Sequence, residues 1–289
     1  MLNKYIFHKQ PSEFIGSVEH YADAKTVLFG APFDSTTSNR PGARFGPAAI
    51  RAESYGLETY SPYQNRDLTD CGLFDSGDLE LPFGAPEHAL GMIKQYTAQI
   101  LTDNKRPFLL GGEHLVTLGA VEATLEKYPD LHIIHFDAHA DLREDYLGNP
   151  LSHATVVRRC FDRLGKGRIF QFGIRSGDRK EFAFADEGGV SMTRFGFDGL
   201  AETLVKLGDV PIYLTIDLDV LDPSVFPGTG TPEPGGVIFM ELLNATISVC
   251  QNGNVVACDL VELAPHYDGS GVSTAVGCKM VREMVIGVG

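Results

Sequence analysis

Short, continuously apolar runs recur along this chain and constrain its fold more than any other feature. They are rich in Val, Ile and Phe. The runs are TVLFG (26–30), PFLLG (107–111), HIIHFD (132–137), RIFQFGI (168–174), PIYLTID (211–217) and NVVACDL (254–260). Strands that are apolar along their whole length, rather than at every second residue, are typical of a parallel sheet covered on both faces. We therefore expect these runs to be buried strands of a mostly parallel sheet.

Helical patterns fill the intervals between these runs. In 86–101, the side chains of Leu90, Ile93, Tyr96, Thr97, Ile100 and Leu101 fall on one helical face. Further helical patterns cover 114–127, 198–207, 239–250 and 273–286, and Gly46-Pro47 is typical of a helix start. Strands that alternate with helices predict an α/β fold with three layers, α/β/α. No linker, repeat or shift in composition divides the chain, so we expect residues 1–289 to form a single domain.

Charge and cysteine usage exclude several classes of protein. The net charge is −14, which argues against a nucleic-acid or anionic-membrane partner because both bind basic surfaces. An acidic chain is compatible with a cationic small molecule. The five cysteines are scattered and form no CxxC pair, which indicates reduced thiols in a cytoplasmic protein. The first residues, MLNKYIFHKQPSEF, lack the pattern of a signal peptide, and no apolar run is long enough to span a membrane.

Three possible metal ligands directly follow the apolar run 132–137. Asp137, His139 and Asp141 occupy alternate positions of HFDAHADL. If the chain stays extended there, all three side chains point the same way. Burying carboxylates together is costly without compensating cations, so this pattern favours a metal site over a solvated loop. His135 shares the spacing but lies one step deeper, and we interpret it as a core histidine.

Polar residues also follow three other predicted strands. Asp217 and Asp219 come two apart after PIYL, His114 follows PFLLG, and Glu262 follows NVVACDL. His114 and Glu262 are weak signals when taken alone. Ligands of open parallel sheets bind at the carboxyl ends of the strands, where these segments could converge.

The candidate ligands are two histidines and four aspartates, which is too many for one zinc ion. A set rich in oxygen and free of thiolates suits two ions of the Mn²⁺ type. Two such ions, roughly 3.5–4 Å apart, can share a hydroxide and make it a strong nucleophile. By formal counting, four carboxylates and one hydroxide leave this cluster about one unit negative, which favours a cationic substrate.

The motifs GGEH, FDAHADL, SHAT, TIDLDVLDPSVFPGTGTPEPGG and DLVELAP together resemble the ureohydrolase (arginase-like) family. They occur in the family's order and span nearly the whole chain, and SNRPGARFGPAAIR (38–51) resembles the family's N-terminal loop and helix. Within the family the chain is most similar to the bacterial agmatinases. The resemblance implies a three-layer fold with an eight-stranded, mostly parallel sheet, and subunits that assemble as homotrimers or homohexamers.

The resemblance also implies two manganese ions and gives each site residue a role. Asp137 and Asp217 would bridge the ions, His114 and Asp141 would complete one metal site, and His139 and Asp219 the other. His153 matches the family's proton-shuttling histidine, Glu262 the carboxylate that holds the guanidinium group, and Thr231 a pocket threonine. Asp141 would also orient the attacking hydroxide. The implied reaction cleaves agmatine to putrescine and urea, a step of polyamine biosynthesis.

Two positions depart from the family's patterns. Ala154 replaces a glycine that is common after the shuttle histidine, and we expect little effect because alanine is also small. Arg143 stands where arginases carry an asparagine that binds the amino-acid end of arginine, and their nearby serine-rich stretch is absent. This favours a substrate without an α-carboxylate.

Other functions remain open at this point. Hydrolases of guanidinobutyrate, arginine or formiminoglutamate would share the metal site and differ in how they bind the far end of the substrate. The zinc-dependent deacetylases share a related fold, but they use one catalytic metal ion and do not need the His114 position. A non-catalytic protein on this scaffold would typically have lost ligands, whereas all six are present here.

Overall fold

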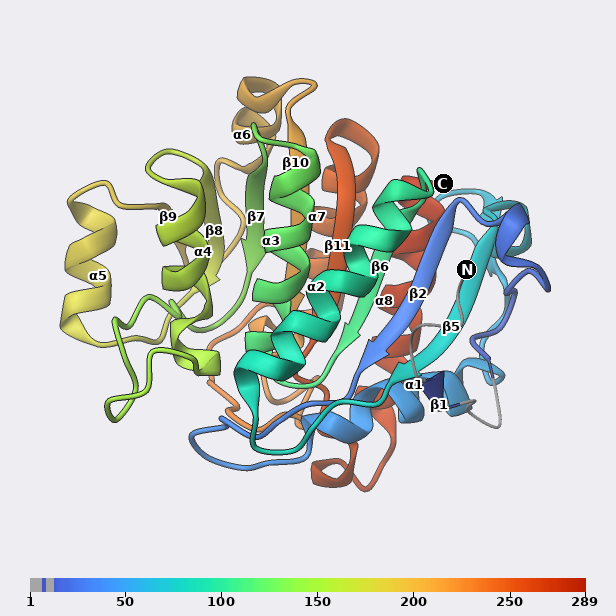
Figure 1. Ribbon diagram of the computed structural model, residues 1–289, viewed down its shortest axis with the longest axis horizontal. Helices are drawn as coiled ribbons and strands as arrows, with labels where there is room; N and C mark the ends of the chain where they lie inside the picture. Colours follow the sequence, from blue (N-terminus) through green and yellow to red (C-terminus); the bar gives the residue numbers. More distant parts are fainter. Residues whose placement is uncertain (1–6, 9–12) are drawn as a thin grey trace.

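The computed structural model describes residues 7–8 and 13–289, and its centre is one large sheet between two layers of helices (Figure 1). The order of its strands is β1 (Phe7–His8), β5 (Leu73–Leu79), β2 (Thr26–Ala31), β6 (Arg106–Gly111), β11 (Asn254–Val261), β10 (Pro211–Asp217), β7 (His132–Phe136), β8 (Ile169–Ile174) and β9 (Ser191–Arg194). The eight strands from β5 to β9 in this order are parallel. The predicted eight-stranded, mostly parallel sheet is therefore confirmed, and the two-residue β1 adds an antiparallel edge.

Helices cover both faces of the sheet, as the alternating pattern predicts. Figure 1 shows α2 (Pro86–Thr102) and α3 (Thr117–Lys127) in front of the sheet, and α7 (Phe239–Asn252) and α8 (Val272–Val288) behind it. The other helices are α1 (Gly46–Ser54), α4 (Val156–Leu164), α5 (Arg179–Asp186) and α6 (Leu200–Leu207), and a small separate sheet pairs β3 (Tyr60–Ser61) with β4 (Arg66–Asp67). Two hydrophobic clusters, one on each face, fill the space between the layers.

The sequence patterns identify six of the eight parallel strands and miss β5 and β9. Strand β5, LFDSGDL, carries two aspartates and does not look buried. In the structure Asp75 and Asp78 both accept hydrogen bonds from Arg51 of α1, whose side chain is buried, so each carboxylate has a cationic partner inside the protein. Strand β9, SMTR, is short and partly exposed at the other edge of the sheet. The helices α4 and α5 are also missing from the sequence prediction.

The four strands at the centre of the sheet, β6, β11, β10 and β7, position the candidate site. Because they are neighbours and parallel, their carboxyl ends and the loops that follow lie at one edge. These strand ends and loops carry His114, Glu262, the pair Asp217 and Asp219, and the segment 137–141. The described cysteines are all buried and free, and among residues 7–8 and 13–289 no helix is long and apolar enough to cross a membrane. The prediction that the chain starts without a signal peptide falls mainly on residues outside those described.

Candidate active site

His114 lies at the centre of one group of carboxylates. Its Nδ1 atom is 3.0 Å from Oδ2 of Asp137, 3.3 Å from Oδ2 of Asp141 and 3.4 Å from Oδ2 of Asp217. All four side chains are buried. They come from the end of β10 and from the loops after β6 and β7, so the parallel sheet brings together residues up to about a hundred positions apart in the sequence.

His139 and Asp219 form a second group beside the first. Nδ1 of His139 is 3.0 Å from Oδ2 of Asp219 and 3.5 Å from Oδ1 of Asp137. Asp137 therefore faces both histidines, His114 through Oδ2 and His139 through Oδ1. The structure thus brings all six predicted residues together, in two neighbouring groups that meet at Asp137. Their role as metal ligands stays a prediction.

The backbone brings these side chains together by turning, not by staying extended, and in this respect the sequence argument was wrong. Strand β7 ends at Phe136, and Asp141 has a φ of 52°, in the left-handed region that non-glycine residues rarely adopt. After β10, residues Leu218–Val220 form a 3₁₀ turn in which Oδ1 of Asp217 accepts the N–H of Asp219 at 2.8 Å. Asp137 accepts the N–H of His139 at 2.6 Å in the same way. Each aspartate thus holds the turn that carries the next candidate ligand.

Buried polar partners orient the cluster from behind. Nε2 of His114 is 2.9 Å from the hydroxyl of Thr215, which leaves Nδ1 facing the carboxylates. Gln171 donates to Nδ1 of His135 and to the carbonyl of Ala140, and this fixes its amide orientation. The proton of His135 therefore sits on Nε2, which donates to Asp137 at 2.9 Å. His135 is fully buried, in keeping with the core histidine expected from the sequence, and it also supports a candidate ligand.

The donor set fits a pair of divalent cations. Nδ1 of His114 is buried and, within the described residues, has no partner with good hydrogen-bond geometry, although three carboxylates surround it. Burial and the nearby charges of Asp219 and Asp137 raise the pKa of Asp217 well above its ordinary value. Two divalent cations would compensate this crowded negative charge, and a thiolate-free set of imidazole and carboxylate suits Mn²⁺-type ions.

His153 and Glu262 lie next to the cluster. Nδ1 of His153 is 3.6 Å from Oε1 of Glu262, and both side chains are buried. Burial alone lowers the pKa of His153, but the carboxylates of Glu262, Asp141 and Glu113 together outweigh this effect and raise the pKa to about 8. Glu262 has a φ of 66° and accepts the N–H of His114 at 2.9 Å, so a strained backbone aims it at the cluster.

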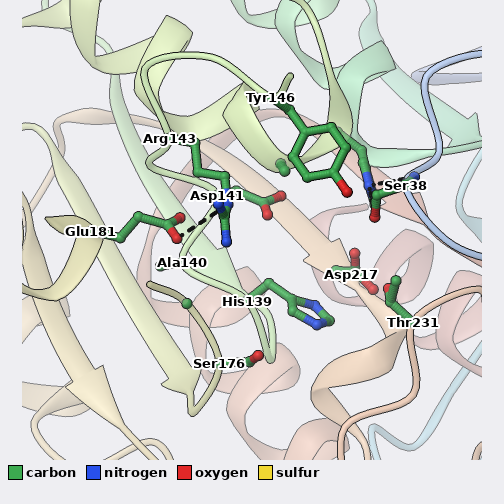
Figure 2. A pocket seen from close by; sticks show the side chains of 13 residues that line it. Ser38, His139, Ala140, Asp141, Arg143, Tyr146, Ser176, Glu181, Asp217 and Thr231 are labelled. Carbon is green, nitrogen blue, oxygen red and sulfur yellow. Dashed lines mark hydrogen bonds and ion pairs between the residues drawn. The ribbon is translucent and has the colours of Figure 1, made fainter. Parts of the chain in front are cut away.

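A cavity of about 270 Å³ opens over these residues. Figure 2 shows His139 and Asp217 at its floor, Ser38 and Thr231 on one side, and Arg143 and Glu181 on the other. Thr231 donates to Oδ2 of Asp219 at 3.2 Å. The full lining comprises Ser38, His139, Ala140, Asp141, Arg143, Tyr146, His153, Ala154, Ser176, Gly177, Glu181, Asp217 and Thr231. Glu262 is buried and does not itself line the cavity.

Arg143, which departs from the arginase pattern, is held at the cavity wall by two carboxylates. Its Nε atom is 3.5 Å from Oε2 of Glu181, and Nη1 is 3.3 Å from Oδ2 of Asp178. The guanidinium is thus already paired in the absence of an anionic group from a substrate.

Sequence reasoning missed several residues that shape the site. Glu113 lies inside the GGEH motif, but only His114 of that motif was predicted to belong to the site. Ser38 lies in the N-terminal motif and contacts His153. Tyr146 and Glu181 line the cavity. Membership of a motif is the one signal that could have found Glu113 and Ser38.

Comparisons with known proteins agree with this geometry. The model of the arginase family matches residues 24–287 of this chain. The chain is 48% identical to the agmatinase of Bacillus subtilis over 276 residues, 95% of each chain. It is 39% identical to the N(1)-aminopropylagmatine ureohydrolase of Thermococcus kodakarensis over 246 residues, 83% of each chain. A crystal structure of a Clostridium difficile protein, 52% identical in sequence, superposes with a TM-score of 0.91 and covers 93% of this chain and 98% of its own.

The family match covers most of the chain, and the fold and the order of the motifs agree with it. The chain belongs to the arginase family.

Proposed function

We propose that this protein hydrolyses agmatine to putrescine and urea. The observation that carries the proposal is the convergence of six imidazole and carboxylate side chains, with the His153–Glu262 pair beside them. His139, Asp141, Asp217 and His153 of this group line one cavity. The similarity to the Bacillus subtilis agmatinase supports agmatine as the substrate. A protein of net charge −14 also suits a dicationic substrate better than a zwitterion.

Two manganese ions are the proposed cofactor. His114 and Asp141 would hold one ion and His139 and Asp219 the other, with Asp137 and Asp217 shared between them. Such a pair, when bound, supplies Lewis-acid activation of the water that attacks the guanidinium carbon. Within the described residues, the two groupings around Asp137 support this division of the ligands.

The chain's own residues bind the substrate and move the proton. Glu262 would hold the guanidinium through charge-assisted hydrogen bonds, and Thr231 would contact it at the cavity wall. Asp141 would accept a hydrogen bond from the attacking water and orient it. The leaving amine must be protonated, because an amide anion is a poor leaving group. His153 would donate this proton from Nδ1, the ring nitrogen that faces Glu262 and thus the bound guanidinium.

One other substrate has a specific observation in its favour. The Thermococcus kodakarensis relative is a ureohydrolase of N(1)-aminopropylagmatine, a longer cation with the same guanidinium group. The two activities would share the metal site and differ at the outer part of the cavity. The proposal extends to polyamine biosynthesis in the cytoplasm and to a homotrimer or homohexamer, as the family resemblance implies.

The decisive test is a urea assay with manganese-loaded protein. Agmatine, N(1)-aminopropylagmatine, arginine and guanidinobutyrate are run in parallel under the same conditions. Urea released mainly from agmatine supports the proposal. Urea released mainly from another of these compounds would keep the reaction and replace the substrate, and no urea from any of them would overturn the reaction.

A further inference from the structure

The side of the His153 ring that points away from Glu262 is occupied by Ser38. The backbone N–H of Ser38 donates to Nε2 of His153 at 3.0 Å, and the Ser38 hydroxyl oxygen is 2.8 Å from the same atom. Ser38 is exposed and lines the cavity, whereas His153 is buried. Ser38 thus covers the Nε2 side of the imidazole.

A buried carboxylate fixes the loop that carries Ser38. Glu113 has no exposed surface, and it accepts the N–H and hydroxyl of Thr36 and the hydroxyl of Thr37. The Thr36 hydroxyl in turn accepts the N–H of His153 at 3.2 Å. The loop and the start of the histidine turn are therefore tied together directly before Ser38. The position of its hydroxyl is built into the site and is not an accident of a mobile loop.

The two groups of Ser38 differ in what they can bind. A backbone N–H only donates, so it satisfies Nε2 only while that atom carries a lone pair. When His153 is protonated, Nε2 carries a hydrogen and faces the Ser38 N–H, and these two donors repel each other. A hydroxyl can do both: it donates to Nε2 while that atom carries a lone pair, and it accepts from Nε2–H in the protonated ring. It also accepts after the ring has given up its Nδ1 proton, because the neutral ring then keeps its hydrogen on Nε2. Serine at position 38 therefore complements the imidazole throughout a proton transfer.

We propose that Ser38 is a positioning residue for proton transfer, whose hydroxyl keeps the His153 ring in the same orientation in both of its protonation states. This inference rests on the proposed function, in which His153 protonates the leaving amine. The hydroxyl acts through His153 and does not itself need to touch the substrate.

Several charges face His153 besides Ser38. Glu262 lies on the Nδ1 side, and the charges of Asp141 and Glu113 also act on the ring. These carboxylates favour the protonated imidazole whether or not Ser38 is present. Loss of the Ser38 hydroxyl should therefore weaken the protonated state without abolishing it, and the activity should decline instead of disappearing.

The test compares Ser38→Ala, Ser38→Thr and Ser35→Ala with the wild-type protein in the agmatine urea assay. Ser35→Ala is the matched control, because Ser35 lies in the same loop and its hydroxyl accepts from the N–H of Gly84, not from His153. We expect Ser38→Ala to lower kcat roughly tenfold, the effect of losing one hydrogen bond to a charged group, with little change in KM. Ser38→Thr, which keeps the hydroxyl, should restore most of kcat, and Ser35→Ala should resemble the wild type.

The pH profile separates positioning from a general disturbance of the loop. The hydroxyl hydrogen-bonds more strongly to the charged ring than to the neutral ring, and so raises the pKa of His153. Its removal should therefore shift the high-pH decline of kcat to lower pH. Wild-type kcat and an unshifted profile in Ser38→Ala would overturn the inference while leaving the proposed function intact. An equal loss in Ser35→Ala and Ser38→Ala would also overturn it. Absence of urea from the wild-type protein would overturn the proposed function itself, and this inference with it.

Discussion

The buried ion pair between α1 and β5 offers a sharp test of how this fold tolerates charge inside its core. Nε of Arg51 is 2.7 Å from Asp75, its Nη1 contacts Asp78, and Arg51 has no exposed surface. Arg51→Met keeps most of the side-chain volume but leaves two buried carboxylates without their cation. Breaking a buried pair in this way costs about 3–5 kcal/mol. For a domain of roughly this size, that loss lowers Tm by about 6–20 °C.

Thermal unfolding followed by circular dichroism measures this shift against two matched variants. Arg163→Met breaks a pair of similar length, 2.9 Å to Glu122, whose arginine is 50% exposed, and it should cost no more than about 1 kcal/mol. Arg51→Lys keeps the charge without the planar fork that reaches both carboxylates, so it should fall between the two. A Tm for Arg51→Met equal to that of Arg163→Met would refute the reasoning that burial sets the cost.

Four further predictions concern the active site. His153→Ala should retain both metal ions and lower kcat by about 10²–10⁴-fold, as measured by metal analysis and urea release, and full activity would exclude it as the proton donor. Asp219→Ala should bind less manganese, and unchanged stoichiometry would remove it from the ligands. Glu262→Ala should raise KM or abolish turnover while the metals stay bound, and loss of the metals as well would make it structural. Because the pKa of His153 is raised to about 8, its protonated, donating form is present below that pH. In the wild type, kcat should therefore fall as the pH rises through about 8, and a flat profile would contradict this.

Much of the fold could be predicted because the central strands are apolar along their whole length. Strands such as β7 and β10 are buried on both faces, and this leaves a direct trace in the sequence. Strand β5 leaves no such trace, because its buried aspartates are paired with Arg51, a residue from another element. No local sequence pattern predicts that these two carboxylates pair with a buried arginine about twenty-five positions earlier in the chain.

The same distinction applies to the site. Asp137 with His139, and Asp217 with Asp219, are visible as residues two apart at a strand end, although turns and not an extended chain bring them together. The contact between Ser38 and His153 joins residues 115 positions apart, so only the folded chain reveals it. The pairing of Arg143 with Glu181 is equally hidden, because it depends on the way α5 packs beside the cavity.

The central claim is that two metal ions held by these six side chains support hydrolysis of a guanidinium group. The most direct measurement is a titration of metal-free protein with Mn²⁺, in which bound manganese per chain and urea released from agmatine are followed together. We predict two ions per chain at saturation and urea release that requires both of them. Full urea release with only one ion bound, or none with two ions bound, would contradict the account.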